Sequence, residues 1–189
     1  AKAGGQVFVD GVTVVDADGQ VLGTQGAPQF GSNWDDDQDL TPFRLTEGRG
    51  PLTAGEVALD SVAAGASGYA LGDAVSLVGP QGPVSATLVG IFRFGTSGNL
   101  AGATIAAFDT ATAQDLLLDG AEAYTEIDAV ADEGVGQAAL ADAVRAVVGP
   151  DVTVQTGQQA ADQAAADITA GLAFINIFLL VFAGIALFV

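Results

Sequence analysis

The chain contains no cysteine, no histidine and no methionine among its 189 residues. Without cysteine it forms neither a disulfide framework nor a thiolate metal site, and it has no thiol nucleophile. Without histidine it lacks the usual general base and the commonest metal ligand, so the Ser-His-Asp and Cys-His catalytic schemes are excluded. Methionine is missing even at position 1, and we therefore expect these residues to be a piece of a longer chain.

Basic residues are also scarce, because five Lys and Arg face 23 Asp and Glu, for a formal net charge of −18. The five are scattered along the chain and form no basic patch. A nucleic acid would be repelled, since affinity for a polyanion begins with neutralising its phosphates. The glycines of residues 94–103 lack the Walker spacing and the lysine that follows it, so no ATP-binding motif is present. We expect no cofactor and no nucleic-acid partner.

Charged side chains disappear altogether at the end of the chain. From Leu172 to Val189 no residue is charged, and Asn176 is the only strongly polar one. A helix over this run rises roughly 27 Å, close to the ~30 Å thickness of a bilayer's hydrocarbon core. A buried helix of a soluble protein would normally show one polar face, which this run lacks. We predict that residues 168–189 begin a transmembrane helix. Its membrane-facing or bundle-facing side chains include Leu172, Ile175, Asn176, Phe178, Leu180, Phe182, Gly184 and Leu187.

The flank of this span indicates the side of the membrane on which the rest of the chain lies. No Lys or Arg follows Arg145, whereas Asp151, Asp162 and Asp167 precede the span. Cytoplasmic flanks carry an excess of Lys and Arg, so this flank is predicted to lie outside the cytoplasm. We expect a protein of the cell membrane, with residues 1–167 forming an extracytoplasmic domain.

Short strands and helices alternate through residues 1–167 without a repeating βαβ pattern. Strands are predicted at 7–22 (strand, turn, strand), 55–60, 74–94 (a hairpin), 103–108, 124–131 and 151–156. Helices are predicted at 61–73, 109–120, 134–150 and 157–171, and residues 24–43 read as a polar loop. This mixture predicts an α+β fold with two lobes, leading into the C-terminal transmembrane helix.

Two aspartates precede predicted helices and are interpreted as N-caps. Asp109 stands in "FDTA", which matches half of an aspartic-protease signature, but such enzymes need two carboxylates that share a proton and no second copy is present. The cap is therefore the favoured role of Asp109, and the same reasoning holds for Asp60. A secreted hydrolase with a carboxylate pair remains the third-ranked hypothesis. The aromatic side chains Trp34, Phe43, Phe92 and Phe94 are expected in the core rather than on a partner surface.

The acidic run "DDDQD" offers the only candidate metal ligands, and its match to a metal-binding motif is weak. Asp35, Asp37 and Asp39 match the first three ligand positions of a calcium loop. The sixth position, where glycine makes the sharp turn, is Leu40, and the twelfth is Thr46. A solvated acidic loop is therefore favoured over a metal site.

A series of short motifs occurs in a fixed order between residues 45 and 95. They have the forms "GR.P...GEV.L", "LGD.V.L" and "VGI". Their positions include Gly48, Arg49, Pro51, Gly55, Glu56, Val57, Leu59, Gly72, Asp73 and Gly90. In this order and spacing the motifs resemble the extracytoplasmic core domain of MacB/FtsX-type ABC transporter permeases. The upstream "GAPQFGSNW" and the later "FDTATAQDLL" resemble the actinobacterial branch of that family.

The resemblance implies a permease domain without catalytic activity of its own. Such a domain couples ATP-driven motion of a separate ATPase to export or extraction of a substrate, or to activation of a cell-envelope partner. The implied partners are the ATPase subunit, a second permease copy or paralogue, the membrane, and an unidentified cargo or envelope protein. In this family the domain lies between the first and second of typically four transmembrane helices. The alternative hypothesis is a single-pass, membrane-anchored surface binding domain, with weak calcium binding at residues 35–39.

Overall fold

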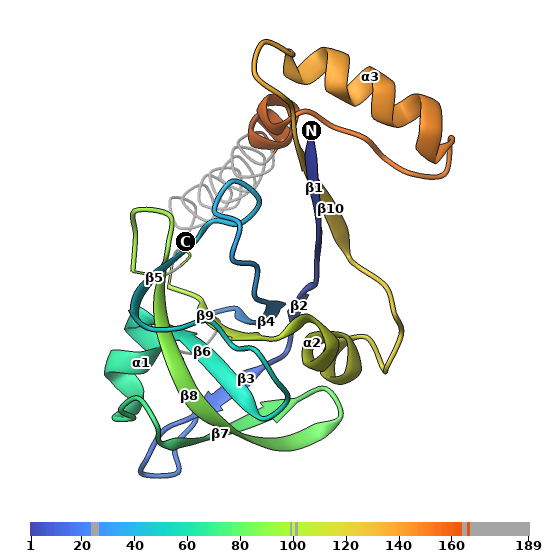
Figure 1. Cartoon of the computed structure of the whole chain (residues 1–189). Helices are drawn as coiled ribbons and strands as arrows, with labels where there is room; N and C mark the ends of the chain where they lie inside the picture. Colours follow the sequence, from blue (N-terminus) through green and yellow to red (C-terminus); the bar gives the residue numbers. More distant parts are fainter. Residues whose placement is uncertain (24–26, 99, 101, 164–165, 167–189) are drawn as a thin grey trace, which may run out of the picture. The chain divides into compact units, whose positions relative to one another are not determined.

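The computed structural model describes residues 1–23, 27–98, 100, 102–163 and 166 (Figure 1). The chain divides into two compact units, Ala1–Val130 and Ala131–Val189. The first unit combines strands with helices α1 (Ser61–Ser67) and α2 (Thr110–Leu117). The described part of the second unit is helical. The predicted mixed α+β fold is confirmed.

The strands of the first unit follow one another closely along the chain. They are β1 (Lys2–Gln6), β2 (Phe8–Asp10), β3 (Thr13–Val15), β4 (Gln29–Asn33), β5 (Phe43–Gly48), β6 (Glu56–Asp60), β7 (Ala74–Gly79), β8 (Gly82–Phe94), β9 (Thr104–Phe108) and β10 (Glu126–Val130). Strands β1 and β10 form a separate antiparallel pair, with Lys2 opposite Val130. The others form one sheet in the order β2-β4-β9-β6-β8-β7-β3, and β5 pairs with β8 outside this path.

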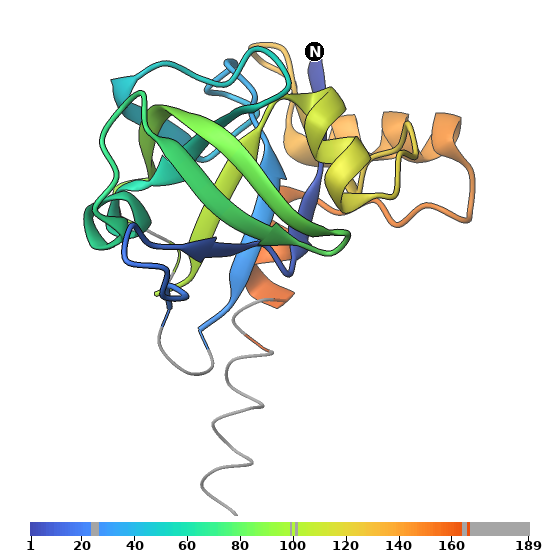
Figure 2. The same ribbon diagram turned by 90° about the horizontal axis from the view of Figure 1, so that it is seen from below.

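Strand β8 is the common partner within this sheet. It is 13 residues long, and its first half forms the predicted hairpin with β7, which Figure 2 shows curling across the sheet. Its last part pairs with β5 along one edge and with β6 along the other. A strand shared among three neighbours bends the sheet, and register shifts occur in β5 between Leu45 and Glu47 and in β6 between Val57 and Ala58.

The core has two clusters because the central strands are buried on both faces. Successive side chains of a strand point to opposite faces. Val57 and Leu59 of β6 therefore join a cluster that includes residues of α1 and α2, whereas Ala58 joins an aromatic cluster with Phe43 and Phe92. The predicted core role is confirmed for Phe43 and Phe92, whereas Trp34 and Phe94 are partly buried and pack against that second cluster.

Both predicted helix caps are confirmed. Asp60 is fully buried, and its Oδ1 accepts hydrogen bonds from the backbone N–H groups of Val62 and Ala63. Its Oδ2 accepts a third bond, 2.7 Å long, from the N–H of Ile105. Strands β6 and β9 pair through their backbones at Ala58 and Leu59. The side chain of Asp60 then binds the next residue of β9, Ile105, where this backbone pairing ends. Asp109 caps α2 by accepting from the N–H of Thr112 at 3.1 Å.

The predicted polar loop at 24–43 is wrong, because β4 and the start of β5 lie within it. Strand β4 is rich in small polar residues, yet Gly31, Ser32 and Asn33 are buried. At Gly31 a Cβ would come within 2.5 Å of Val12 and 2.8 Å of Leu117, so the strand is covered by side chains from other elements. The strand was missed because its own residues are small and polar, and the apolar side chains that bury it belong to other elements. Strand β1 was also missed, because its residues, which include Gly4 and Gly5, have little tendency to form a strand by themselves.

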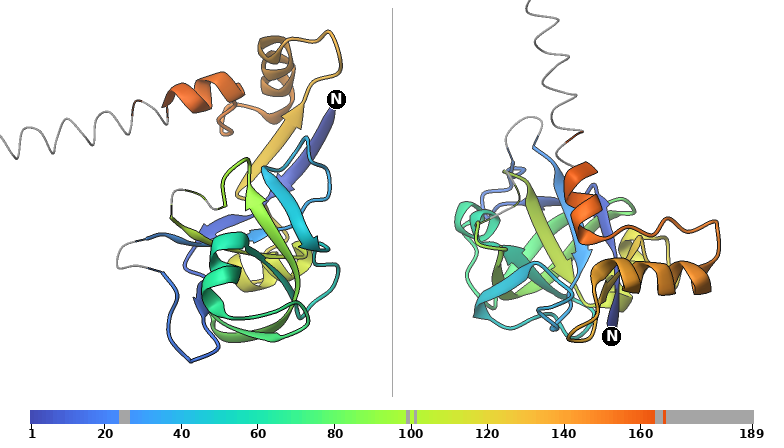
Figure 3. Two further views of the ribbon diagram at one scale, coloured as in Figure 1. Left: turned by 90° about the vertical axis from the view of Figure 1, so that its left-hand side faces the viewer. Right: turned by 90° about the horizontal axis from the view of Figure 1, so that it is seen from above.

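The second unit contains the predicted helix α3 (Gln137–Val148) and a further helix whose described residues begin at 157 (Figure 3). The predicted strand at 151–156 is wrong. Arg145 donates a hydrogen bond to the carbonyl of Val154, and Thr156 caps the following helix by accepting from the N–H of Gln159. Among the described residues no helix is long and apolar enough to cross a membrane. The predicted span 168–189 lies outside the described residues.

Candidate functional site: an acidic hollow in the first unit

The motif positions around the end of β5 are joined by an ion pair. Arg49 Nη1 donates to Glu56 Oε2 at 2.7 Å, and Arg49 Nη2 contacts the other carboxylate oxygen. Glu56 Oε2 also accepts from the N–H of Leu52 at 2.9 Å. These donors, Arg49 first, lower the pKa of Glu56 to about 2. The loop that carries Pro51 and Leu52 is therefore closed at its base by a bidentate, charge-assisted contact.

Two glycines of the motifs allow β5 and β8 to approach each other at this point. A Cβ at Gly90 would lie 2.1 Å from the carbonyl oxygen of Arg49. Gly48 has φ +71°, and a Cβ there would lie 2.2 Å from the carbonyl oxygen of Val89. The neighbouring atoms belong to the backbone and cannot move aside as a side chain does. Any other residue at these positions would separate the strands.

The remaining motif positions fasten other chain segments to β8. Gly72 donates its N–H to the carbonyl of Leu88 at 2.8 Å, and the carbonyl of Asp73 accepts from the N–H of Leu88 at 2.9 Å. The carbonyl of Gly55 accepts from the N–H of Thr87 at 2.7 Å. Val57 and Leu59 are core residues. The structure therefore gives these positions backbone and packing contacts, and only Pro51 among them lines the hollow described next.

This hollow, of about 440 Å³, lies at the surface of the first unit. Five segments of the chain form its wall. They are Gly5 of β1, residues 33–36 at and after the end of β4, Pro51 and Leu52 after β5, Asp109 and Thr110 at the start of α2, and Tyr124 before β10. The side chains that determine its chemistry are Trp34, Asp35, Asp36, Leu52, Asp109 and Tyr124. It is an open depression of the surface and not an enclosed cavity.

Asn33 holds three of these segments together. It is only 2% exposed, and its Oδ1 accepts from the N–H of Val7 at 2.7 Å. Its Nδ2 donates to the carbonyl of Gly5 at 3.0 Å and to Thr110 Oγ1 at 3.4 Å. One buried amide at the end of β4 thereby fixes β1, the residue that follows it and the first turn of α2 beside the hollow. The ring of Tyr124 lies against Gly5, where a Cβ would come within 2.3 Å of it.

The wall formed by Trp34 is also fixed. Its indole Nε1 donates to Asp36 Oδ1 at 2.7 Å, and its backbone N–H donates to the carbonyl of Phe108 at 2.7 Å. The indole ring packs on Phe43 and Phe92, with ring centroids 6.0 and 5.7 Å away. Trp34 thus packs against the core and also lines the hollow, next to the carboxylate that its indole binds.

The hollow is acidic and partly apolar. Asp35, Asp36 and Asp109 line it, and no Lys or Arg of the described residues does. Asp109 Oδ2 is buried and, within the described part of the chain, accepts no hydrogen bond. Leu52 and Tyr124 are 65% and 47% exposed. The lining therefore combines three carboxylates with exposed apolar side chains.

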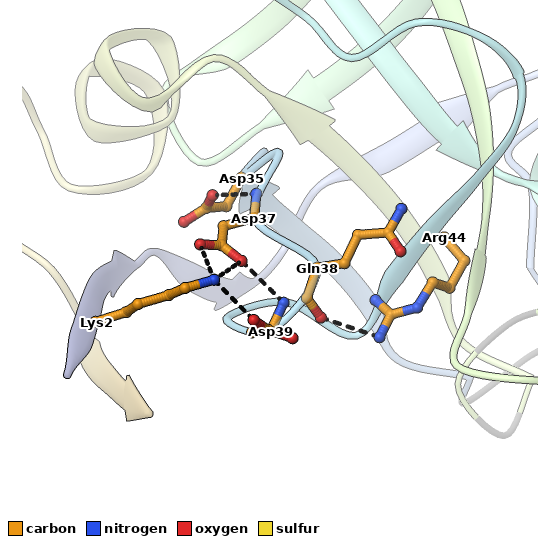
Figure 4. Close-up of polar contacts among 6 residues, drawn as sticks. All are labelled: Lys2, Asp35, Asp37, Gln38, Asp39 and Arg44. Carbon is orange, nitrogen blue, oxygen red and sulfur yellow. Dashed lines mark hydrogen bonds and ion pairs between the residues drawn. The ribbon is translucent and has the colours of Figure 1, made fainter. Parts of the chain in front are cut away.

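The candidate metal ligands are only partly brought together (Figure 4). Lys2 Nζ contacts Asp37 Oδ2 at 2.9 Å and Asp39 Oδ2 at 2.7 Å, while Asp35 Oδ1 accepts from the N–H of Asp37 at 2.8 Å. These contacts, with the bond to Asp37 first, raise the pKa of Lys2, and the ammonium lowers the pKa of Asp37. In the ranges that the structure describes, no group of three carboxylates is placed to hold a metal ion. A lysine from β1 lies where a cation would be expected.

Sequence reasoning missed most of the hollow. Asp36, Leu52 and Tyr124 carry no signal in the sequence, because nothing there shows that the three segments meet. Asn33 lies between Phe30 and Trp34 in a segment that was predicted to be a loop. Only the strand found there shows that its amide is buried. Trp34 and Asp109 were identified for other roles, core and cap, and they fulfil those roles while also lining the hollow.

Comparisons with known proteins support the fold. No family model matches the chain, and no curated protein matches it. Among solved structures, the periplasmic region of MacB from Actinobacillus actinomycetemcomitans is similar, with a TM-score of 0.55 and 15% sequence identity. The match covers 87% of this chain and 76% of that one. At this identity the likeness shows a common fold.

Proposed function

We propose that residues 1–167 form the extracytoplasmic domain of an ABC transporter permease of the MacB/FtsX type. The observation that carries the proposal is the fold shared with the MacB periplasmic region over 87% of the chain. The ordered motifs between residues 45 and 95 support it. In this proposal the domain is not catalytic, and ATP is hydrolysed on a separate subunit. Residues 168–189 begin the transmembrane helix that joins the domain to the rest of the permease.

The domain acts mechanically in this proposal. Motion driven by ATP at the cytoplasmic side reaches it through the transmembrane helices, and it passes that motion to a cargo or an envelope protein. The contacts of the motif positions support a mechanical role. The Arg49–Glu56 pair and the close approach at Gly48 and Gly90 fasten strands and loops to one another, as a domain moved as a body requires.

Labelling of single cysteines tests the location, since residues 1–189 contain no cysteine, and any cysteine elsewhere in the full-length protein is first replaced by serine. In the full-length protein in its native cells, Asp18→Cys, at an exposed turn, is expected to react with a membrane-impermeant maleimide. Ala107→Cys, at a fully buried position, is the matched control and is expected to react only after unfolding. Reaction of Asp18→Cys only after cell lysis would place the domain in the cytoplasm and refute the proposal.

Co-purification tests the transporter assignment. The full-length protein, isolated in mild detergent under a tag, is expected to carry an ABC ATPase subunit and a second permease copy or paralogue. Its ATP hydrolysis is expected to require that subunit. A full-length protein with a single membrane span and no bound ATPase would instead support the anchored binding domain.

A further inference from the structure

We propose that β1 and β10 form a zipper that opens from its outer end while the eight-stranded sheet stays folded. A pull on the two chain ends of this pair then lengthens the domain in one limited step. The use of such a step rests on the proposed function, in which motion of the transmembrane helices loads these chain ends. The opening itself is a property of the first unit and is measured without the transporter.

The register of the pair brings its two chain ends together. Lys2 lies opposite Val130, and Gln6 lies opposite Glu126. The chain therefore enters β1 and leaves β10 at the Lys2–Val130 end, which is the outer end of the zipper (Figure 1). Hydrogen bonds of an antiparallel pair lie perpendicular to the strands. A force that separates the two chain ends therefore acts on one pair of residues at a time, beginning at Lys2 and Val130.

Few apolar contacts hold the zipper closed. It is a two-stranded sheet of its own, and such a sheet is marginally stable in water. Of the five residues of β1 and the five of β10, only Gln6 is buried, and Ile127 is 68% exposed. Gly4 and Gly5 regain more backbone freedom on opening than other residues do. The two strands therefore separate at a smaller cost in free energy than strands of the main sheet, whose β9 is buried throughout.

Buried hydrogen bonds hold the inner end of the zipper. Gln6 Nε2 donates to the carbonyl of Leu40 at 3.0 Å. Asn33 accepts from the N–H of Val7 at 2.7 Å and donates to the carbonyl of Gly5 at 3.0 Å. Breaking these bonds would leave buried polar groups without partners, which costs more than breaking exposed bonds. Opening is therefore expected to stop before Gly5.

The position of this stop determines the length of the step. Opening as far as Gly5 frees residues 2–4 of β1 and residues 128–130 of β10, which lie opposite each other. Six freed residues span about 20 Å when the chain is extended. The domain lengthens by this amount and no further until the main sheet unfolds.

Ion pairs close the outer end. Lys2 Nζ contacts Asp37 Oδ2 at 2.9 Å and Asp39 Oδ2 at 2.7 Å (Figure 4). The lysine side chain is 50% exposed and those of the aspartates are 36% and 62% exposed, so dissolved salt screens both contacts. Lys2 thus acts as a latch on the first pair of residues to open, and the strength of this latch depends on ionic strength.

Hydrogen exchange of the 189-residue protein in mild detergent measures the opening. Lys2→Gln removes the latch and is expected to speed the exchange of those amides of residues 128–130 that bond to β1 about two- to fivefold, as the loss of exposed ion pairs predicts. These amides belong to β10, whose own sequence the variant leaves unchanged. The amides of β9, which is buried throughout, are the internal reference and are expected to exchange more slowly, at the same rate in both proteins.

A charge-matched variant and salt separate the latch from the general charge of the protein. Arg93→Gln removes the same charge at an exposed position of β8 that makes no ion pair within the described residues. It is expected to leave the exchange of residues 128–130 unchanged. Raising NaCl from about 0.1 to 1 M weakens exposed ion pairs, so the difference between the wild type and Lys2→Gln is expected to shrink.

A pull on single molecules measures the step. Handles are attached through cysteines in Ala1→Cys and Glu133→Cys, since residues 1–189 contain no cysteine of their own. The first event is expected to be a lengthening by about 20 Å, before the sheet unfolds. Lys2→Gln is expected to lower the force of this event without changing its length. Handles at Asp18→Cys and Glu122→Cys, both exposed and outside the zipper, bypass it and are expected to show no such step.

Three results would overturn the inference. They are equal exchange rates of residues 128–130 and of β9 in the wild type, equal effects of Lys2→Gln and Arg93→Gln, or no step of this length between handles at residues 1 and 133. None of them bears on the proposed transporter role, which is tested in cells by labelling and co-purification.

Discussion

The carboxylate of Asp60 allows a sharp test of how the sheet and α1 are joined. In Asp60→Asn one oxygen can still cap α1 through the N–H groups of Val62 and Ala63. The amide nitrogen then faces the N–H of Ile105 in the place of an oxygen that accepted at 2.7 Å. If the amide is turned round, the helix loses its cap instead. Either orientation sets a donor against a donor inside the core.

The magnitude follows from the number of buried donors that lose an acceptor. Leaving one buried N–H unpaired costs about 1–3 kcal/mol of unfolding free energy. Asp109→Asn is the matched control, because Asp109 also caps a helix after a buried strand but its Oδ2 accepts no bond from the described residues. Asparagine caps as well as aspartate, so the control is expected to lose no more than about 0.5 kcal/mol.

Urea unfolding measures the difference. The emission of Trp34 reports the first unit, since this single tryptophan packs on Phe43 and Phe92 in its core. Circular dichroism followed in parallel checks that one transition is observed by both probes. Equal losses in Asp60→Asn and Asp109→Asn would show that the bond to Ile105 contributes nothing, and the reasoning would be refuted.

The pH dependence of the same pair gives a second measurement. Burial raises the pKa of Asp60 above its ordinary value of 3.8, so the folded protein binds this proton more tightly than the unfolded chain does. The contribution of Asp60 to the stability of the wild type is therefore expected to fall as pH rises from that value through the raised pKa. Asp60→Asn cannot titrate and is expected to lack this step, whereas Asp109→Asn retains it.

Two further predictions concern the loop that walls the hollow. Gly90→Ala places a Cβ 2.1 Å from the carbonyl oxygen of Arg49 and is expected to lower the unfolding free energy by at least about 1–3 kcal/mol. Gly79→Ala, on β7, is the control, because the nearest atom to its Cβ is 3.8 Å away. It is expected to be nearly neutral in the same urea assay. The pKa of Glu56 is lowered from 4.5 to about 2, so its contribution to stability is present above pH 4.5 and is lost as pH falls toward 2. The difference in urea midpoint between wild type and Glu56→Gln is thus expected to shrink over that range, and a constant difference would contradict the assigned ion pair.

Local signals in the sequence predicted much of the fold. Asp60 and Asp109 precede their helices with the chemistry of an N-cap, and the β7–β8 hairpin has two apolar runs around a turn. Such features depend on neighbours along the chain. Strand β4 was missed because its burial comes from Val12 and Leu117, which are distant in sequence. The strand predicted at 151–156 had β-branched residues but no partner strand among the described residues.

The hollow could not have been predicted in the same way. Its walls come from five separate segments, and one buried amide, Asn33, decides how three of them meet. Identical residues on another scaffold would form no hollow. The ordered motifs of residues 45–95 did indicate the fold, because their glycines stand where few other residue types fit. Gly48 and Gly90 lie at a close backbone contact, and Gly55 and Gly72 have positive φ.

The pairing of β1 with β10 has a consequence for how the protein is made. Residues 2–6 are synthesised first, and their partners, residues 126–130, more than a hundred residues later. Contacts so distant in sequence form slowly, because the entropy of closing the intervening chain is lost before the contact stabilises anything. Strand β1 therefore has no partner strand until residues 126–130, near the end of the unit, have been synthesised.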